Sequence, residues 1–208
     1  LRRLVGSEMC IRDSFRRERN GAKGRTHEIE RLVARSLRGA VDLEQLGPLS
    51  MTVDCEILNA DGGTRCASIT AGSIALRLAI RRLIASGRCL PAKLRPTEQQ
   101  RKEGWKPPVL SKEEAHGHEM AVMPCDVAAL SVGMVDGEVK VDLDYVLDSN
   151  ADVDMNVVMT SAGAFVEVQG TGEEATYTRE ELDSLIDNAV SGIKMLHEHQ
   201  VKVLEGVN

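Results

Sequence analysis

Apolar and polar residues alternate along several stretches of the chain, and this alternation predicts β-strands. Every second residue is apolar over residues 51–57, and the same holds for residues 139–143. A period of two is the pattern of a strand with one buried face. The apolar run at residues 127–135 predicts a further strand. Asp136-Gly137 after it predicts a type I′ hairpin turn, because both central residues of that turn need positive φ.

A spacing of three to four residues between apolar positions predicts three helices. We expect the first helix to have Thr26 as its N-cap. The second covers residues 66–80 and carries a single charge, that of Arg77, so it is predicted to run through the middle of the core. The third follows Thr178 and Glu181, which have the spacing of a capping box.

The order of these elements predicts the fold class α+β. A helix, a strand and a second helix are followed by two hairpins, the second of them within residues 155–170, and then by the last helix. This order is typical of α+β layers and differs from that of a doubly wound parallel sheet. Residues 88–124 contain five of the six prolines and many charges, which predicts no long regular element there. We expect a surface insertion over residues 91–120.

Composition narrows the class of protein. The chain has 208 residues, of which 42% are hydrophobic but only 2% aromatic, so its core must be aliphatic. No apolar run approaches the roughly 20 residues that span a bilayer. The five cysteines are scattered without a C-x-x-C pair, which argues against both a disulfide framework and a zinc site. We expect a reduced, cytoplasmic protein.

The charge is distributed unevenly along the chain. The net charge is −6, yet residues 1–38 hold 11 Lys and Arg against 5 Asp and Glu. A local basic patch on an acidic protein can still recognise phosphate groups. For Arg31, Arg35 and Arg38 we expect the plainer role of a solvated helix face.

The stretch Asp61-Gly62-Gly63-Thr64-Arg65 combines two flexible residues with a guanidinium at the start of the predicted central helix. Glycines let the backbone turn sharply and approach a ligand, while a helix start offers unpaired N–H groups and the positive end of the dipole. The arginine fork matches phosphate oxygens. An anion, such as inorganic phosphate, is one interpretation. A tight strand-to-helix turn followed by an exposed arginine is the other.

Gly24 and Arg25 repeat this arrangement just before Thr26. An arginine at a helix start faces the positive end of the dipole, which is unfavourable unless an anion lies between them. An anion shared by Arg25 and Arg65 would explain both positions, and a surface arginine is the alternative. We expect the two guanidinium groups to converge beside the glycine loop if the anion is shared.

Residues 148–154 are rich in acidic and amide side chains. Their spacing matches the opening of a calcium loop, but Val153 stands where that loop requires Gly and Met159 where it requires Glu. We expect Asp148 to end one strand and Asp154 to begin the next. The pair is then a candidate Mg²⁺ site beside a phosphate, and a polar loop that caps a strand is the alternative.

Four stretches, in this order, resemble the successive signatures of ribonuclease PH, a family of phosphorolytic 3′→5′ exoribonucleases: GRTHEIERLVARSLRGAVDLEQLG, DCEILNADGGTRCASITAG, LDYVLDSNADVDMNVVMT and EVQGTGE. The resemblance runs from about Arg16 to the C-terminal helix and is interrupted at residues 88–124. It implies a two-layer α+β fold with a mixed sheet, similar to ribosomal-protein domain 2. It also implies a ring of six subunits. The implied activity is a nucleotidyltransferase reaction that trims the 3′ ends of tRNA precursors with inorganic phosphate and releases nucleoside diphosphates.

The resemblance also implies roles for individual residues. It assigns phosphate binding to Arg25, Gly63, Thr64 and Arg65, and it makes Asp148 and Asp154 the essential acidic pair, which we expect to be catalytic and to hold Mg²⁺. We expect the RNA backbone to be bound by the basic residues before this region, namely Arg16, Arg17, Arg19 and Lys23.

The N-terminus departs from the family. Family members carry further strands before the region that matches Arg16, whereas residues 1–14 resemble nothing in the family. We therefore expect residues 1–14 to be poorly packed and residues 15–208 to form a domain that lacks its first strands. The alternative functions are a non-catalytic RNA-binding or scaffold subunit of an exosome-like ring, and a phosphate-binding module unrelated to RNA. Retention of Arg25, Arg65, Asp148 and Asp154 favours the enzyme.

Overall fold

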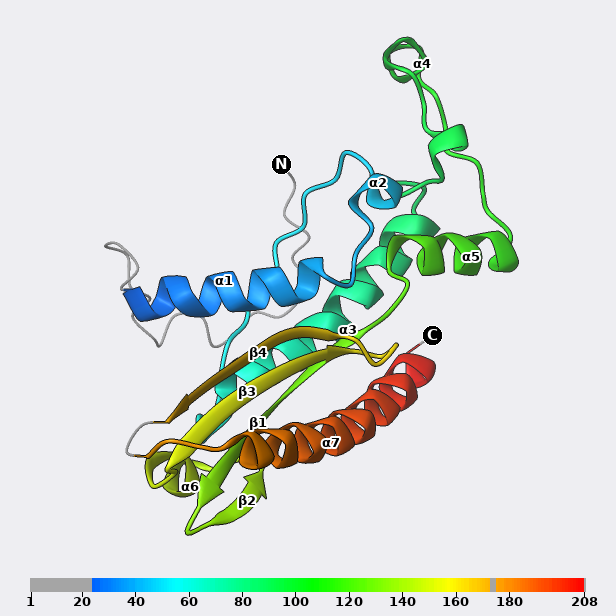
Figure 1. Ribbon diagram of the computed structural model, residues 1–208. Coiled ribbons are helices and arrows are strands. Elements are labelled where there is room, and N and C mark those ends of the chain that lie inside the picture. The colour runs from blue at the N-terminus through cyan, green and yellow to red at the C-terminus, as the bar shows by residue number, and fades with distance from the viewer. Residues whose placement is uncertain (1–23, 173–174, 208) are drawn as a thin grey trace.

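Helices surround one antiparallel sheet in the computed structural model, which describes residues 24–172 and 175–207 (Figure 1). The elements, in chain order, are α1 (Gly24–Arg38), α2 (Leu43–Leu46), α3 (Thr64–Ala85), the 3-10 turn η1 (Ala92–Leu94), α4 (Glu98–Lys102), α5 (Lys112–Val122), β1 (Val127–Val135), β2 (Glu138–Val141), α6 (Tyr145–Ser149), β3 (Val153–Thr160), β4 (Phe165–Gly172) and α7 (Arg179–Gly206). The predictions for residues 1–14 and for Arg16, Arg17, Arg19 and Lys23 fall outside the described residues. Of Arg25, only the backbone is described.

The sheet has the order β2-β1-β3-β4, and every pair of strands in the described part of the chain is antiparallel. The mixed sheet that the resemblance implied is therefore not seen there. Asp136 and Gly137 join β1 to β2 with φ values of 52° and 75°, so the predicted I′-type turn geometry is confirmed. The second predicted hairpin is also confirmed, as β3 and β4.

Helices cover both faces of the sheet. All nine residues of β1 are buried, because alternate side chains enter two separate hydrophobic clusters. Val127 and Ala129 pack with α1 and α3 on one face, whereas Ala128 and Leu130 pack with α7 on the other. Figure 1 shows α1 and α7 on opposite sides of the strands. The predicted α+β class is confirmed, and β1 is buried on both faces because helices lie on each side of it. None of the helices in residues 24–172 and 175–207 is long and apolar enough to cross a membrane.

Side chains of α3 replace a neighbouring strand along half of β1. The strand β2 pairs only with the last four residues of β1. Before that point, the N–H of Val127 donates to Ser73 Oγ over 3.1 Å and the N–H of Ala129 donates to Thr70 Oγ1 over 3.0 Å. Gln200 of α7 donates its Nε2 to the carbonyl of Val127 over 2.9 Å. The buried edge of β1 is thus hydrogen-bonded, as buried backbone groups require, and α3 is held against it.

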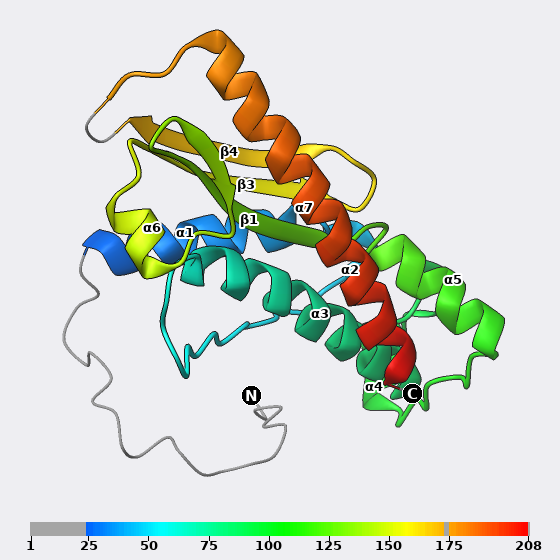
Figure 2. The same ribbon diagram turned by 90° about the horizontal axis from the view of Figure 1, so that it is seen from below.

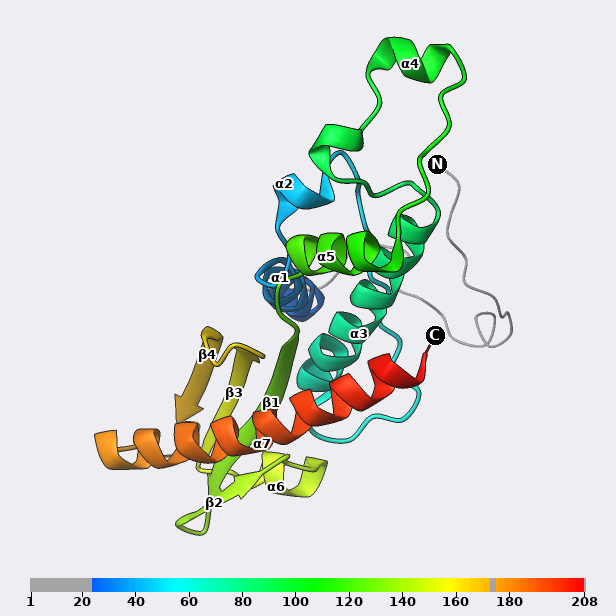
Figure 3. The same cartoon turned by 90° about the vertical axis from the view of Figure 1, so that its right-hand side faces the viewer.

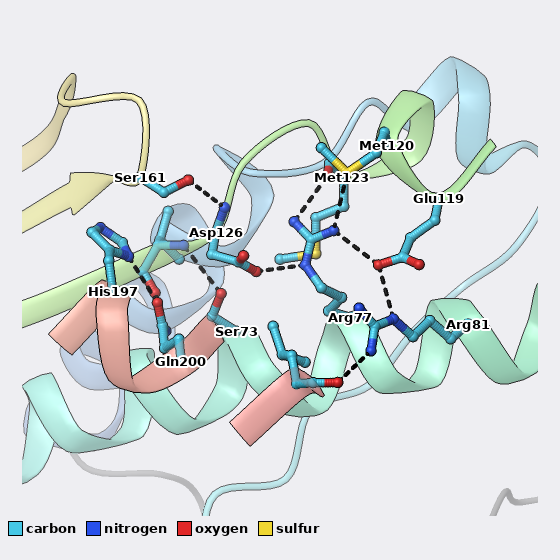
Figure 4. A network of polar contacts seen from close by, with 12 residues as sticks. Ser73, Arg77, Arg81, Glu119, Met120, Met123, Asp126, Ser161, His197 and Gln200 are labelled. Atoms are coloured by element: carbon cyan, nitrogen blue, oxygen red, sulfur yellow. Dashed lines mark hydrogen bonds and ion pairs between the residues drawn. The ribbon is translucent and has the colours of Figure 1, made fainter. Parts of the chain in front are cut away.

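Arg77, the single charged residue within residues 66–80 of α3, lies inside a buried ionic network (Figure 4). Arg77 is only 4% exposed. It donates Nε to Asp126 Oδ1 over 2.7 Å, Nη1 to Glu119 Oε1 over 3.1 Å and Nη2 to the carbonyl of Met123 over 3.0 Å. Arg81 donates its Nε to the same Glu119 oxygen over 2.9 Å. The network joins α3 to α5 and to the start of β1.

Two local predictions are wrong. Residues 51–57 have no strand structure, although Met51 and Val53 pack against the cluster under α1 and α3. An alternating segment becomes a strand only if another strand pairs with it, and none of the described strands does. Thr26 is not the N-cap of α1, which begins two residues earlier at Gly24.

The predicted absence of a long regular element in residues 88–124 is also wrong. The helix α5 has 11 residues and begins at a capping box formed by Ser111 and Glu114, three residues after Pro108. Its residues His118 and Glu119 are buried. The C-terminal end of the predicted insertion, residues 91–120, therefore belongs to the core. The capping box starts a helix there, and this helix packs against α3.

Candidate active site

Each of the two glycines before α3 stands at a position that disfavours any other residue. A Cβ at Gly62 would lie 1.8 Å from the carbonyl oxygen of Leu143, so the loop backbone packs directly on the chain after β2. Gly63 is the N-cap of α3 and has a φ of 67°, in the left-handed region that favours glycine. The glycine loop is thus both tightly packed and sharply turned.

Asp61 fixes this loop to the start of α6. Its Oδ1 accepts hydrogen bonds from the N–H of Gly62 over 3.0 Å and from the N–H of Tyr145 over 2.6 Å. Tyr145 is the first residue of α6, which this contact holds near the start of α3 (Figure 2). Asp148, on the last turn of α6, is carried to this end of the molecule by the same contact.

The first turn of α3 presents backbone donors at the site. The first four N–H groups of a helix have no partner within the helix. At Gly63 no described side chain forms a cap hydrogen bond to them. Thr64 and Arg65 are the first two residues of α3. This combination of free N–H groups, positive dipole and guanidinium is the arrangement that binds anions at helix starts.

Arg65 lies between two carboxylates that come from different elements. Its Nη1 is 3.4 Å from Glu28 Oε1 of α1, and its Nη2 is 3.7 Å from Asp154 Oδ2 of β3. The side chain of Arg65 is 28% exposed and that of Asp154 is 19% exposed. Since Glu28 follows Arg25 by one helical turn, the start of α1 adjoins the start of α3. The convergence of the Arg25 and Arg65 side chains itself stays a prediction.

The two predicted acidic residues lie on different kinds of element. Asp154 is the second residue of β3, where it pairs with Gly133 of β1, close to its predicted position. Asp148 does not end a strand but lies in α6, because Asp144 caps a short helix after β2. The described residues contain no group of three or more His, Cys, Asp or Glu placed to hold a metal ion.

Three residues that the sequence did not single out lie between the glycine loop and the sheet: Ser131 and Asn156 on the strands and Cys66 on α3. Ser131 of β1 and Asn156 of β3 are register partners, and both are buried. Cys66 donates its thiol to Asn156 Oδ1 over 3.1 Å. The hydroxyl of Ser131 accepts the N–H of Leu143 over 3.2 Å and would lie 3.2 Å from a Cβ at Gly63. For Ser131 the signal in the sequence was a single hydroxyl within the apolar run of β1, whereas neither Asn156 in β3 nor Cys66 in α3 had a comparable signal.

Cys66 is a hydrogen-bond donor rather than a nucleophile. Burial raises the pKa of its thiol to about 12, against a smaller opposite effect of the neighbouring Arg65. The thiolate, which is the reactive form of cysteine, is therefore almost absent at neutral pH. The chemistry of this site has to come from the arginine, the backbone donors and the carboxylates.

Comparison with known proteins gives matches on both sides of the proline-rich segment. Residues 6–81 match the 3′ exoribonuclease family, domain 1, and residues 126–192 match the 3′ exoribonuclease family, domain 2. The first match begins within residues 1–14, where the sequence analysis found no resemblance. Residues 82–125 lie between the two matches.

Curated relatives share almost half of the aligned residues. The chain is 48% identical to ribonuclease PH of Corynebacterium glutamicum (strain R) over 174 residues, which cover 84% of this chain and 59% of that protein. It is also 48% identical to ribonuclease PH of Rhodopirellula baltica over 186 residues, which cover 89% of this chain and 66% of that protein. The chain thus spans about three fifths to two thirds of the length of these relatives.

Solved structures share the fold at low identity. Rice (Oryza sativa) Rrp46 matches with a TM-score of 0.56 and 13% identity, over 89% of this chain and 68% of that one. An archaeal exosome core matches with a TM-score of 0.53 and 18% identity, over 85% of this chain and 63% of that one. At these identities the two structures bear on the fold alone.

Proposed function

Because this chain belongs to the 3′ exoribonuclease family that includes ribonuclease PH, we propose that it shortens RNA from the 3′ end by phosphorolysis. The activity is that of a nucleotidyltransferase, and the substrate is the 3′ end of tRNA precursors. One observation carries the proposal: Arg65 stands on the first turn of α3, behind the left-handed Gly63 and 3.7 Å from Asp154.

Inorganic phosphate is the nucleophile of the proposed reaction. One of its oxygens forms a bond to the phosphorus of the last phosphodiester. The bond from that phosphorus to the 3′ oxygen of the preceding nucleotide breaks. A nucleoside diphosphate leaves, and the shortened RNA keeps a 3′ hydroxyl. No side-chain nucleophile is needed, which agrees with the protonated Cys66.

The protein's task in this reaction is to hold two anions together. Arg65 and the N–H groups of Thr64 and its neighbours would bind phosphate and offset its repulsion from the RNA. Arg25, one turn before Glu28 on the adjoining helix, would contact the same phosphate. Glu28 then has to release Arg65 when phosphate arrives, since both compete for one guanidinium.

Asp148 and Asp154 would hold Mg²⁺. Mg²⁺ at phosphate sites is bound through one or two carboxylates, with waters and substrate phosphates completing its octahedron, so a pair of carboxylates fits it. The ion would supply neutralisation of charge on the reacting phosphate. Asp154 also contacts Arg65, so its carboxylate stays directed toward the bound anion.

The remaining partners of the proposed enzyme follow from the family. Arg16, Arg17, Arg19 and Lys23 would bind the RNA backbone, and six copies of the chain would form a ring. A cytoplasmic location agrees with the free thiols of the four described cysteines. The proposed domain runs over residues 15–208. The excess of Lys and Arg before Arg25 supports RNA binding, because such residues bind phosphate groups of any sequence.

Release of nucleoside diphosphates from a short RNA tests the proposal. Product should form only with phosphate and Mg²⁺ present. Asp148→Asn, Asp154→Asn and Arg65→Gln should each lower the rate by about 100-fold or more. Arg38→Gln, which removes an exposed charge at the far end of α1, should leave the rate unchanged.

Three outcomes would overturn this proposal. Nucleoside monophosphates formed without phosphate would indicate a hydrolase. Full activity of both aspartate variants would remove the catalytic pair. RNA binding without any phosphate-dependent product would favour the alternative of a non-catalytic ring subunit.

A further inference from the structure

Residues 88–111 form a projection that we call the arm. It leaves the end of α3, includes η1 and α4, and returns to the start of α5. Figures 1 and 3 show it extending from the helical end of the molecule, with α4 at its tip, away from the sheet. The arm lies between the two family matches, which end at residue 81 and resume at residue 126.

The arm is built into the fold at its base. Arg95 donates to the carbonyl of Leu90 over 2.9 Å, and its Nη2 donates to the carbonyls of Glu44 and Gln45 over 3.0 and 2.6 Å. On the returning side, Pro107 packs so closely on Gly87 that a Cβ there would lie 2.3 Å from it. The tip also has its own helix, α4, which begins with a capping box.

The charge of the arm opposes that of the rest of the chain. The arm has six Lys and Arg against two Glu, a net charge of +4, within a protein of net charge −6. All of its basic residues except Arg95 are exposed. Among the described residues, Arg101 and Lys106 form no ion pair, whereas Lys102 forms only an exposed pair with Glu98. The excess positive charge is therefore free to attract an anion.

A cavity of about 710 Å³ adjoins the base of the arm, between the ends of α3, α5 and α7. Its lining carries both signs of charge: Arg81, Arg82 and Lys112 stand beside Glu119 and Glu205, and Glu119 pairs with Arg81 over 2.9 Å. Lys112 follows the last residue of the arm. The excess of positive charge is therefore a property of the arm itself, and the cavity at its base adds only Arg82 and Lys112 to it.

We propose that the arm binds the sugar–phosphate backbone of RNA outside the reaction site. Exposed cations in an otherwise polar segment are what non-specific backbone binding needs, because each contact with a phosphate releases counterions. Trp105 adds an aromatic ring, which can stack on a base of any sequence. The choice of RNA as the polyanion rests on the proposed function.

The surface of the arm favours RNA over an acidic protein partner. Protein interfaces have an apolar core that contributes much of their binding energy. The arm exposes a single large apolar side chain, Val109, at 97%. Interfaces with nucleic acids are instead polar and strongly positive.

The test uses two double variants with equal changes in charge. Arg101→Gln/Lys106→Gln neutralises the tip of the arm, and Lys194→Gln/Lys202→Gln neutralises two exposed lysines of α7. A labelled RNA hairpin with a 3′ tail is titrated by fluorescence anisotropy without phosphate or Mg²⁺, so that it stays intact. The arm variant should bind about tenfold more weakly, and the slope of log Kd against log salt should fall by about 1 to 2. The α7 variant should match the wild type.

The tryptophan gives an independent readout. Trp105 is the only tryptophan in the chain, so a change of its emission on addition of RNA reports on the arm alone. Phosphorolysis of an RNA of five nucleotides, which is held by the reaction site, should be equal in wild type and arm variant. Circular dichroism checks that both variants remain folded.

The outcomes separate this inference from the proposed function. If the chain releases no nucleoside diphosphate but the arm variant alone loses RNA affinity, the arm binds RNA and the proposed activity fails. Equal affinity of the arm variant and wild type overturns the inference, whatever the activity. An equal loss in the α7 variant, or equally tight binding of polyglutamate to the wild type, also overturns it.

Discussion

Replacing Arg77 by Met should destabilise the fold more than any other change of a single charge in α3. The substitution keeps much of the volume and removes the cation from the network in Figure 4. The side chains of Arg77 and Glu119 are 5% and 8% exposed, and that of Asp126 is 14% exposed. Water can therefore do little to solvate the two carboxylates that remain.

The loss of stability in Arg77→Met depends on which interactions the former partners of Arg77 retain. Glu119 retains Arg81 at 2.9 Å, whereas Asp126 loses the ion pair of 2.7 Å and the Met123 carbonyl loses its donor. Breaking a buried ion pair by removal of one partner costs about 3–5 kcal/mol. For a chain of this length that loss lowers Tm by roughly 6–20 °C.

Urea unfolding followed by circular dichroism measures the effect. Arg82 is exposed and lies on the same helix, so the free energy of unfolding of the control Arg82→Met should stay within about 0.5 kcal/mol of the wild type. The double variant Arg77→Met/Asp126→Asn should be more stable than Arg77→Met, because it also removes the stranded charge. A free energy of unfolding for Arg77→Met within about 1 kcal/mol of the wild type would refute the reasoning.

Three further predictions concern the glycine loop, the thiols and the buried His118 of α5. Gly62→Ala should lower the free energy of unfolding by about 3 kcal/mol and abolish stabilisation by phosphate in thermal unfolding, because the added Cβ has no space. The control Gly117→Ala on α5 should be neutral or stabilising by up to about 1 kcal/mol. A stable Gly62 variant that still responds to phosphate would contradict this. At pH 8 the thiolate of Cys66 should be on the order of 10⁻⁴ of the total. Peptide mapping after alkylation of the folded protein should therefore find the exposed Cys55 labelled before Cys66, and equal rates would show the burial of Cys66 to be wrong. Burial lowers the pKa of His118 below its ordinary 6.5, so the stability that the neutral side chain contributes is complete above pH 6.5 and is lost as the pH falls. On acidification the free energy of unfolding should therefore drop less for His118→Gln than for the wild type. Parallel pH profiles of the two proteins would exclude the effect.

Local patterns determined the elements whose structure depends on near neighbours. The turn at Asp136 and Gly137 follows from the two residues themselves, and α7 starts where Thr178 and Glu181 form their capping box. The chemistry of the glycine loop was also readable, because Gly63 before a helix start requires a left-handed backbone wherever the loop lies. Such features need no knowledge of the rest of the chain.

Only the tertiary structure decided which distant residues meet. Residues 51–57 have a strand pattern but no described partner strand, so they stay irregular. Arg77 could have been a solvated charge, yet α5 and the start of β1 bring it two buried carboxylates. The pairing of Arg65 with Glu28 and Asp154 joins three elements. A charge or a pairing edge has no fixed partner in a local pattern, because its energy depends on what packing places within a few ångströms of it.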